Sequence, residues 1–178
     1  MPSDALIWQS GGVEKQEDPA MRAVHRTIAV AAFATLGACA SAPPNLDDNL
    51  IVRGDRVGNV ELGMSLTELL ALKGTPTRTI PIPDTNATTY YFDGLMIAAD
   101  DKVYWIVARD ARFRTQMNVS KGSEQIFARA AYGKPKCVVT RDDVTVYDYD
   151  DIYFEVANKT GKVKQIGVQR QTTTCKGN

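Results

Sequence analysis

The chain has 178 residues, and its 21 lysines and arginines balance its 21 aspartates and glutamates. A protein without a basic excess has no electrostatic reason to bind DNA or RNA, so nucleic-acid binding is not an expected function. One histidine and three cysteines leave few residues for nucleophilic or zinc chemistry.

The first feature along the chain is a secretory signal. From Met21, two arginines precede an apolar run, and small residues then lead to a cysteine. A charged head, an apolar segment of about ten residues and a small-residue exit are typical of a signal peptide. The run is shorter than the roughly 20 residues that a membrane-spanning helix needs. We therefore expect residues 21–38 to be a cleaved signal, and residues 1–20 to be an upstream extension outside the native protein.

The end of this signal resembles the lipobox of bacterial lipoproteins, because Leu36, Gly37 and Ala38 directly precede Cys39. The resemblance implies that a diacylglyceryl group is attached to Cys39, which becomes the first residue after cleavage. In that family an aspartate at the next position favours the inner membrane, so Ala40 implies an outer-membrane lipoprotein that faces the periplasm. The lipidated cysteine and a flexible tether would then occupy residues 39–56.

Two cysteines remain after Cys39, and we expect them to form a disulfide. The periplasm is oxidising, so paired cysteines are favoured over free thiols there. A bridge between Cys137 and Cys175 would hold the C-terminal tail, residues 171–178, against the strand that begins near Cys137. The alternative is one buried thiol and one free thiol.

The chain lacks the residues of the common catalytic sites. Its only histidine, His25, lies in the signal peptide, so the secreted part has no base for Ser-His-Asp or Cys-His catalysis. The aspartates between residues 142 and 151 lie where turns are expected, and they lack the spacing of a calcium-binding loop. We expect no enzyme activity, no metal and no cofactor. A carboxylate hydrolase that uses Asp148 or Asp150 is the outside alternative.

The remaining sequence contains an internal repeat with a period of about 57–60 residues. In each half, a predicted helix ends in Gly-x-Pro and is followed by strand-rich sequence, a charged turn and a last strand. The expected fold is α+β, with two tandem repeats at residues 57–108 and 109–170. Each repeat would be a short helix packed on one side of an antiparallel β-meander, with the other side free.

Local signals define both helices. Ser65 and Glu68 predict a capping box at the start of the first helix. In the second helix, Ser123 is the expected cap. The predicted buried stripe of that helix consists of Ile126, Phe127 and Ala130.

The first repeat resembles a known group of proteins. Its helix opens with Gly63-Met64-Ser65, ends with Gly74-x-Pro76 and precedes an aromatic hairpin, as in BamE-type outer-membrane lipoproteins. Two such units on a secreted chain are similar to the β-lactamase inhibitory protein. The resemblance implies a scaffold that binds other proteins through its sheet. No contact residue of the inhibitor can be transferred, because no interface motif matches.

The period-two alternation of the strands predicts different free faces for the two repeats. In the second repeat, the free face would be an ordinary solvated surface. Its residues would be Asp148, Tyr153, Glu155, Gln165 and Gly167.

In the first repeat, the equivalent positions are apolar and aromatic, which is typical of a protein-binding surface. Packing against a neighbouring segment would make Trp105 a core residue instead. A register slip of one residue would turn Tyr104, Ile106 and Ala108 outward. The predicted partner-binding residues are Tyr91, Met96, Trp105 and Val107.

These features together predict a non-catalytic outer-membrane lipoprotein. Its repeats would bind an unidentified periplasmic or outer-membrane protein in envelope assembly or maintenance. One alternative is an inhibitor that inserts the loop at residues 80–87 into a periplasmic or secreted enzyme. Another is a carrier that holds a hydrophobic ligand between its sheets.

Overall fold

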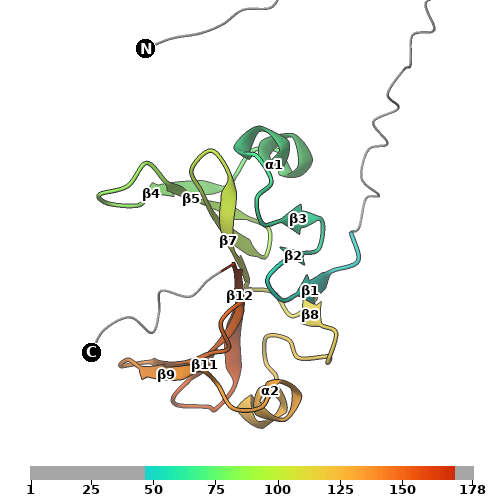
Figure 1. The fold of residues 1–178 in the computed structure, drawn as a ribbon, viewed down its shortest axis with the longest axis vertical. Helices are drawn as coiled ribbons and strands as arrows, with labels where there is room; N and C mark the ends of the chain where they lie inside the picture. The colour runs from blue at the N-terminus through green and yellow to red at the C-terminus, as the bar shows by residue number, and fades with distance from the viewer. Residues whose placement is uncertain (1–46, 171–178) are drawn as a thin grey trace, which may run out of the picture. The chain divides into compact units, whose positions relative to one another are not determined.

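Two antiparallel meanders form most of the fold in the computed structural model, which describes residues 47–170. β7 of the first meander pairs with β12 of the second, so the two halves make one eight-stranded sheet of order β4-β5-β6-β7-β12-β11-β10-β9 (Figure 1). The first meander contains β4 (Arg78–Pro81), β5 (Thr88–Phe92), β6 (Leu95–Ala99) and β7 (Val103–Ala108). The second contains β9 (Cys137–Thr140), β10 (Val144–Asp148), β11 (Ile152–Ala157) and β12 (Val163–Gln169).

The junction between the meanders is nearly symmetric about the pair Val107–Gly167. Ile106 lies opposite Val168 on one side of this pair, and Ala108 lies opposite Ile166 on the other. Each meander would otherwise end in an open strand edge, whose unpaired amides and carbonyls favour pairing with another strand. β7 and β12 pair these amides and carbonyls with each other, so neither of these edges stays open.

A second, four-stranded sheet lies beside the first. It comprises β1 (Leu50–Val52), β2 (Arg56–Val57), β3 (Val60–Glu61) and β8 (Arg114–Thr115), in the order β3-β2-β1-β8. β1 and β8 are parallel, so the start of the described chain is joined to the segment between the meanders. The segment expected to be a flexible tether, residues 39–56, therefore contains β1 and the first residue of β2.

An ion pair fixes the start of this small sheet. The guanidinium of Arg56 donates to both carboxylate oxygens of Asp48 at 2.9 and 3.0 Å, and to the carbonyl of Gly58 at 2.7 Å. The hydrogen bond from Arg56 holds the pKa of Asp48 below its ordinary value. Folding therefore gains from this pair while Asp48 is ionised, and the gain is lost as the pH falls through the lowered pKa.

Residues 47–170 contain two α-helices of eight residues each, α1 (Leu66–Lys73) and α2 (Gln125–Tyr132). The predicted capping box of α1 is confirmed, because the Glu68 amide donates to Ser65 Oγ and the Ser65 amide donates to Glu68 Oε2. Both helices end at glycines with positive φ, 74° at Gly74 and 75° at Gly133.

α2 differs from its prediction. Its N-cap is Glu124 rather than Ser123, and Glu124 makes no side-chain capping bond. The helix start is held instead by the turn between β11 and β12, where the Gln125 amide donates to the Gly161 carbonyl at 2.9 Å. In this helix the buried residue is Ala128. The predicted buried stripe of Ile126, Phe127 and Ala130 is therefore wrong, because all three are exposed.

The hydrophobic core lies between one face of the eight-stranded sheet, the two helices and the small sheet. Phe154 is at its centre, with ring centroids of Tyr132 and Tyr149 at 5.0 and 5.8 Å. The sheet contributes alternate residues, as its period of two requires. The core residues of the sheet include Leu95, Ile97, Ile106, Ala108, Ile152, Phe154, Val156, Ile166 and Val168, and the helices add Leu69 and Ala128.

The expected α+β fold of two helix-on-meander repeats is wrong. The described chain is mostly β, because residues expected to be tether add strands and the helices are short. The meanders also do not form separate units, since β7 and β12 join them into one sheet. Edge pairing between distant strands leaves no signal in the local sequence pattern, so the repeat pattern did not reveal it.

Candidate functional site

The four predicted partner-binding residues lie on the same face of the eight-stranded sheet, which we call the outer face. Met96 pairs with Tyr91 on one side and with Val107 on the other. Trp105 is two residues from Val107 on β7 and therefore faces the same way. The alternative register is excluded, because Ile106 and Ala108 lie in the core on the opposite face.

These four residues differ in accessibility. Val107 is 0% exposed, so it cannot contact a partner. Tyr91, Met96 and Trp105 are half-buried, which leaves part of each side chain open. The accessible part of the predicted site is therefore these three residues.

The outer face of the second meander is not the solvated surface that the sequence predicted. The same row of cross-strand pairs continues through Gly167, Tyr153 and Asp148. All three are buried. The Tyr153 ring lies over Gly167 so closely that any Cβ at position 167 would overlap it. A glycine inside a strand is typical of such a close approach.

Tyr153 lies beside Trp105 of the first meander. Burial raises the pKa of Tyr153 above its ordinary value, and the neighbouring Trp105 side chain opposes that shift. Tyr153 is therefore a neutral, buried side chain at the junction of the two meanders.

Two arginines flank the Tyr91 ring. The guanidinium carbons of Arg78 and Arg109 lie 5.6 and 5.9 Å from its centroid. Such contacts contribute about 0.5–1 kcal/mol each at exposed sites. Arg78 pairs directly with Tyr91 across β4 and β5. The sequence did not predict a role for Arg78, because the Arg-Thr-Ile-Pro sequence of β4 contains a proline and shows no clear strand pattern.

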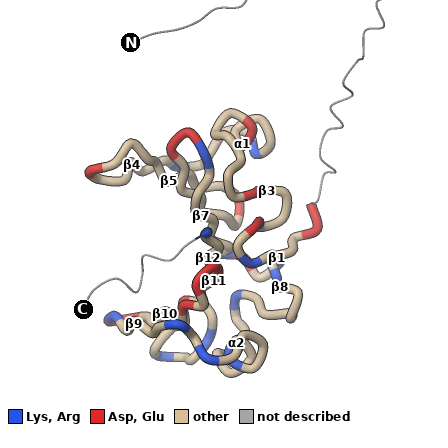
Figure 2. Tube along the Cα trace, in the orientation of Figure 1, with Lys and Arg blue, Asp and Glu red and all other residues tan. Residues whose placement is uncertain are grey.

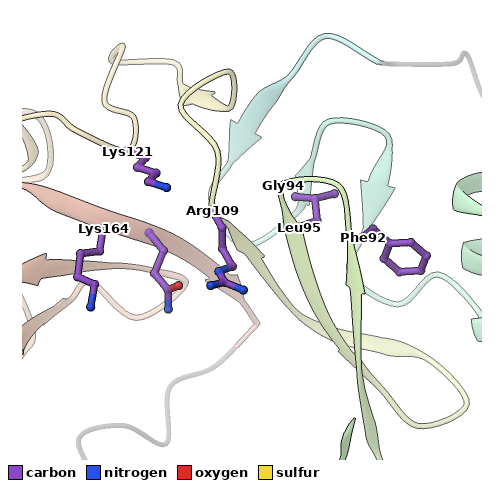
Figure 3. Close-up of a pocket in the computed structure, with 7 residues that line it drawn as sticks. Phe92, Gly94, Leu95, Arg109, Lys121 and Lys164 are labelled. Carbon is purple, nitrogen blue, oxygen red and sulfur yellow. The ribbon is translucent and has the colours of Figure 1, made fainter. Parts of the chain in front are cut away.

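A basic cavity of about 300 Å³ adjoins Arg109. Figure 3 shows Arg109, Lys121 and Lys164 on one side of it, and Phe92 and Leu95 on the other. None of the ion pairs found within residues 47–170 involves these three cations. The cavity therefore offers a site for a carboxylate or phosphate group. Its lining residues are Phe92, Gly94, Leu95, Arg109, Lys121, Lys164 and Gln165.

The aspartates that could have served a hydrolase have structural contacts. Asp151 accepts two hydrogen bonds from Arg53 Nε at 2.8 and 3.0 Å, and Asp150 accepts one from Lys136 at 2.8 Å. Asp148 is fully buried and accepts from the Asp150 amide. In the part of the chain that the structure describes, no three His, Cys, Asp or Glu residues are grouped to hold a metal ion.

The predicted modification sites are described only in part. Cys137 begins β9 and is half-buried, opposite Asp148 on β10. Cys39 and Cys175 lie outside the described residues, so the lipid attachment and the disulfide stay predictions. No helix within residues 47–170 is long and apolar enough to cross a membrane.

Comparisons with known proteins give a limited result. No protein-family model and no curated protein matches the chain. Among solved structures, the uncharacterized protein yfeY from Escherichia coli has a TM-score of 0.51 and 14% identity, covering 67% of this chain and 99% of that one. An identity this low shows a shared fold alone.

Two secretory proteins are also similar in structure. One is an extracellular protein with an SCP domain from Bacillus anthracis, with a TM-score of 0.48, 12% identity and 67% of this chain covered. The other is a cysteine-rich secretory protein from Staphylococcus aureus, with a TM-score of 0.42, 14% identity and 61% covered. The chain spans 47% and 44% of their lengths. The match with a TM-score above 0.5 is to yfeY, so the expected resemblance to BamE-type lipoproteins and the β-lactamase inhibitory protein is wrong.

Proposed function

We propose that this chain is a non-catalytic, lipid-anchored module of the outer membrane that binds another protein in the periplasm. The observation that supports this best is the accessible part of the outer face. It consists of Tyr91, Met96 and Trp105, and two arginines flank the tyrosine. Tyrosine, tryptophan and arginine are the residues most often found at the energetic centre of protein interfaces.

The surroundings of this surface indicate the chemistry of the partner. Arg109 belongs both to the Tyr91 contact and to the basic cavity with Lys121 and Lys164. A partner that places an apolar side chain on Trp105 and a carboxylate in the cavity would be complementary in both shape and charge. We therefore propose an acidic partner surface with an apolar centre.

Affinity capture tests this docking surface. The chain is purified from the cell envelope under mild detergent, alongside a variant with Tyr91→Ala and Met96→Ala. The wild-type chain should retain a partner that the double variant loses, while Tyr104→Ala, on the neighbouring strand β7, retains it. Equal recovery by all three chains would contradict the proposal.

Lipid attachment at Cys39 has its own test. Cells grown with radiolabelled palmitate should label the wild-type chain and not the Cys39→Ser variant. The variant should also leave the membrane fraction after a high-salt wash. A Cys39→Ser chain that remains labelled and salt-resistant would show that another anchor holds the protein.

We also propose a disulfide between Cys137 and Cys175. β9 lies three strands from β12 in the sheet, which is roughly 14 Å. The chain from Arg170 to Cys175 can span about 17 Å, and the bridge itself adds about 5.5 Å between Cα atoms. Cys137 lies opposite Asp148 and therefore on the outer face of the sheet.

Removing this bridge should destabilise the fold. Cys137→Ser is expected to lower the free energy of unfolding by roughly 3–4 kcal/mol, because the unfolded chain gains loop entropy. Cys175→Ser should have the same effect, and the double variant should show no further loss in urea unfolding. Two thiols that react at positions 137 and 175 in the unreduced, denatured protein would contradict the pairing.

An enzyme inhibitor is a second candidate, favoured by the turn between β4 and β5. This turn is braced internally: the Ile82 amide donates to the Ala87 carbonyl at 2.9 Å, and the Thr85 hydroxyl donates to the Ile82 carbonyl at 2.9 Å. Its residues from Pro83 to Asn86 are exposed. A rigid exposed loop loses little entropy on insertion into an active site. Loss of partner capture on replacing this loop, with the Trp105 surface intact, would favour inhibition.

A further inference from the structure

The outward side of α2 is an unexpected apolar surface. Ile126 and Phe127 are 68% and 59% exposed. The side of the helix that packs on the core carries Ala128, Ala131 and Tyr132. Two large apolar side chains therefore point away from the protein, while Ala128, Ala131 and Tyr132 face the core.

Basic residues accompany this apolar surface. A shallow hollow of about 640 Å³ runs along the outward side of α2, and Arg129 and Lys134 line it together with Ile126 and Ala130. Neither cation belongs to an ion pair found within the described residues. Glu124, the acidic residue at the start of the helix, is paired with Lys162 at 3.7 Å. Figure 2 shows several basic residues in and beside α2.

We propose that this side of α2 contacts an anionic lipid bilayer. Ile126 and Phe127 would enter the boundary between headgroups and acyl chains, and Arg129 and Lys134 would pair with lipid phosphates. A short helix with an apolar side and flanking cations is typical of proteins that lie on a membrane surface. The positive charge beside the apolar side chains is complementary to anionic headgroups.

A protein partner fits this surface less well. A stable protein interface buries about 800 Å² on each partner, whereas the outward side of α2 offers two protruding side chains on a helix of eight residues. Two inserted side chains and paired cations are enough for weak membrane contact that adds to a lipid anchor. The bilayer is therefore the occupant that the surface favours.

This contact would also orient the docking surface. α2 packs on the core face of the eight-stranded sheet, and Tyr91, Met96 and Trp105 lie on the opposite, outer face. A chain that places α2 on the membrane would therefore turn its outer face toward the periplasm. The proposal does not depend on which protein docks there.

Site-specific photocrosslinking tests the membrane contact. The full chain carries p-benzoylphenylalanine at position 127, or at position 72 as the control, because Leu72 is 40% exposed on α1. Each chain is added to vesicles of phosphatidylethanolamine and phosphatidylglycerol, or to vesicles of phosphatidylcholine. The N-terminal apolar segment is the same in all chains, so differences between positions report local contact.

We expect a phospholipid adduct from position 127 that is several-fold stronger than from position 72, and only with anionic vesicles. Arg129→Glu combined with Lys134→Glu should reduce the adduct yield at position 127 to the yield at position 72. Arg141→Glu should leave the yield at position 127 unchanged. Equal adducts from positions 127 and 72, no lipid adduct, or equal adducts with neutral vesicles would overturn the proposal. In intact cells, a protein adduct at position 127 would also overturn it. None of these outcomes affects the docking surface, which is tested at position 105.

Discussion

Replacing Gly167 with alanine is expected to lower the free energy of unfolding by about 3 kcal/mol, the upper range for overpacking a buried site. The added Cβ would overlap the Tyr153 ring, which is buried over the glycine. The ring would have to leave its buried site beside Trp105. Urea unfolding followed by circular dichroism measures the loss.

Two further variants show whether the ring causes the effect. Gln165 lies on the same face of β12, and Gln165→Ala should change the free energy of unfolding by less than about 0.5 kcal/mol. The double variant Gly167→Ala with Tyr153→Ala should lose less free energy of unfolding than the two single variants together, because alanine at position 153 removes the overlap. A Gly167→Ala chain as stable as the wild type, or strict additivity with Tyr153→Ala, would show that the ring does not occupy this position.

Trp105→Ala is expected to weaken partner binding by about 2–4 kcal/mol, or roughly 30- to 700-fold in Kd. Trp105 is half-buried on the outer face, so part of its ring is accessible to a partner. Calorimetric titration with the captured partner measures the change. The thermal midpoint of each variant, measured in parallel, separates lost binding from lost folding.

Tyr104→Ala is the matched control for this prediction. Tyr104 is 43% exposed and directly precedes Trp105, at the irregular point of the β6–β7 pairing. Removing its ring should change Kd by less than about threefold. Equal losses at positions 104 and 105 would mean that β7 as a whole, and not the outer face, determines binding.

The features that the sequence predicted correctly depend on neighbouring residues. The capping box needs only Ser65 and Glu68, one helical turn apart, and the helix ends need only a glycine that tolerates positive φ. The alternation that placed Tyr91, Met96 and Trp105 on one face follows from the strand period. Each of these signals is contained within a few residues.

The features that the sequence missed depend on distant contacts. The start of α2 contacts Gly161 in the turn between β11 and β12, and the buried side of the helix carries Ala128 rather than the predicted Ile126 and Phe127. The two meanders form one sheet because β7 pairs with β12, which is distant in the sequence. One signal was present and unused: Gly167 within a strand indicates that a side chain passes close by. That side chain, Tyr153, closes the surface that we expected to be solvated.

The most direct test of the docking surface is photocrosslinking in intact cells with p-benzoylphenylalanine at position 105, and at position 104 as the control. Docking on the outer face predicts a discrete protein adduct from position 105 that is absent from position 104. Mass spectrometry of that adduct would identify the partner. Intramolecular adducts alone, or equal protein adducts from both positions, would contradict a docking site at Trp105.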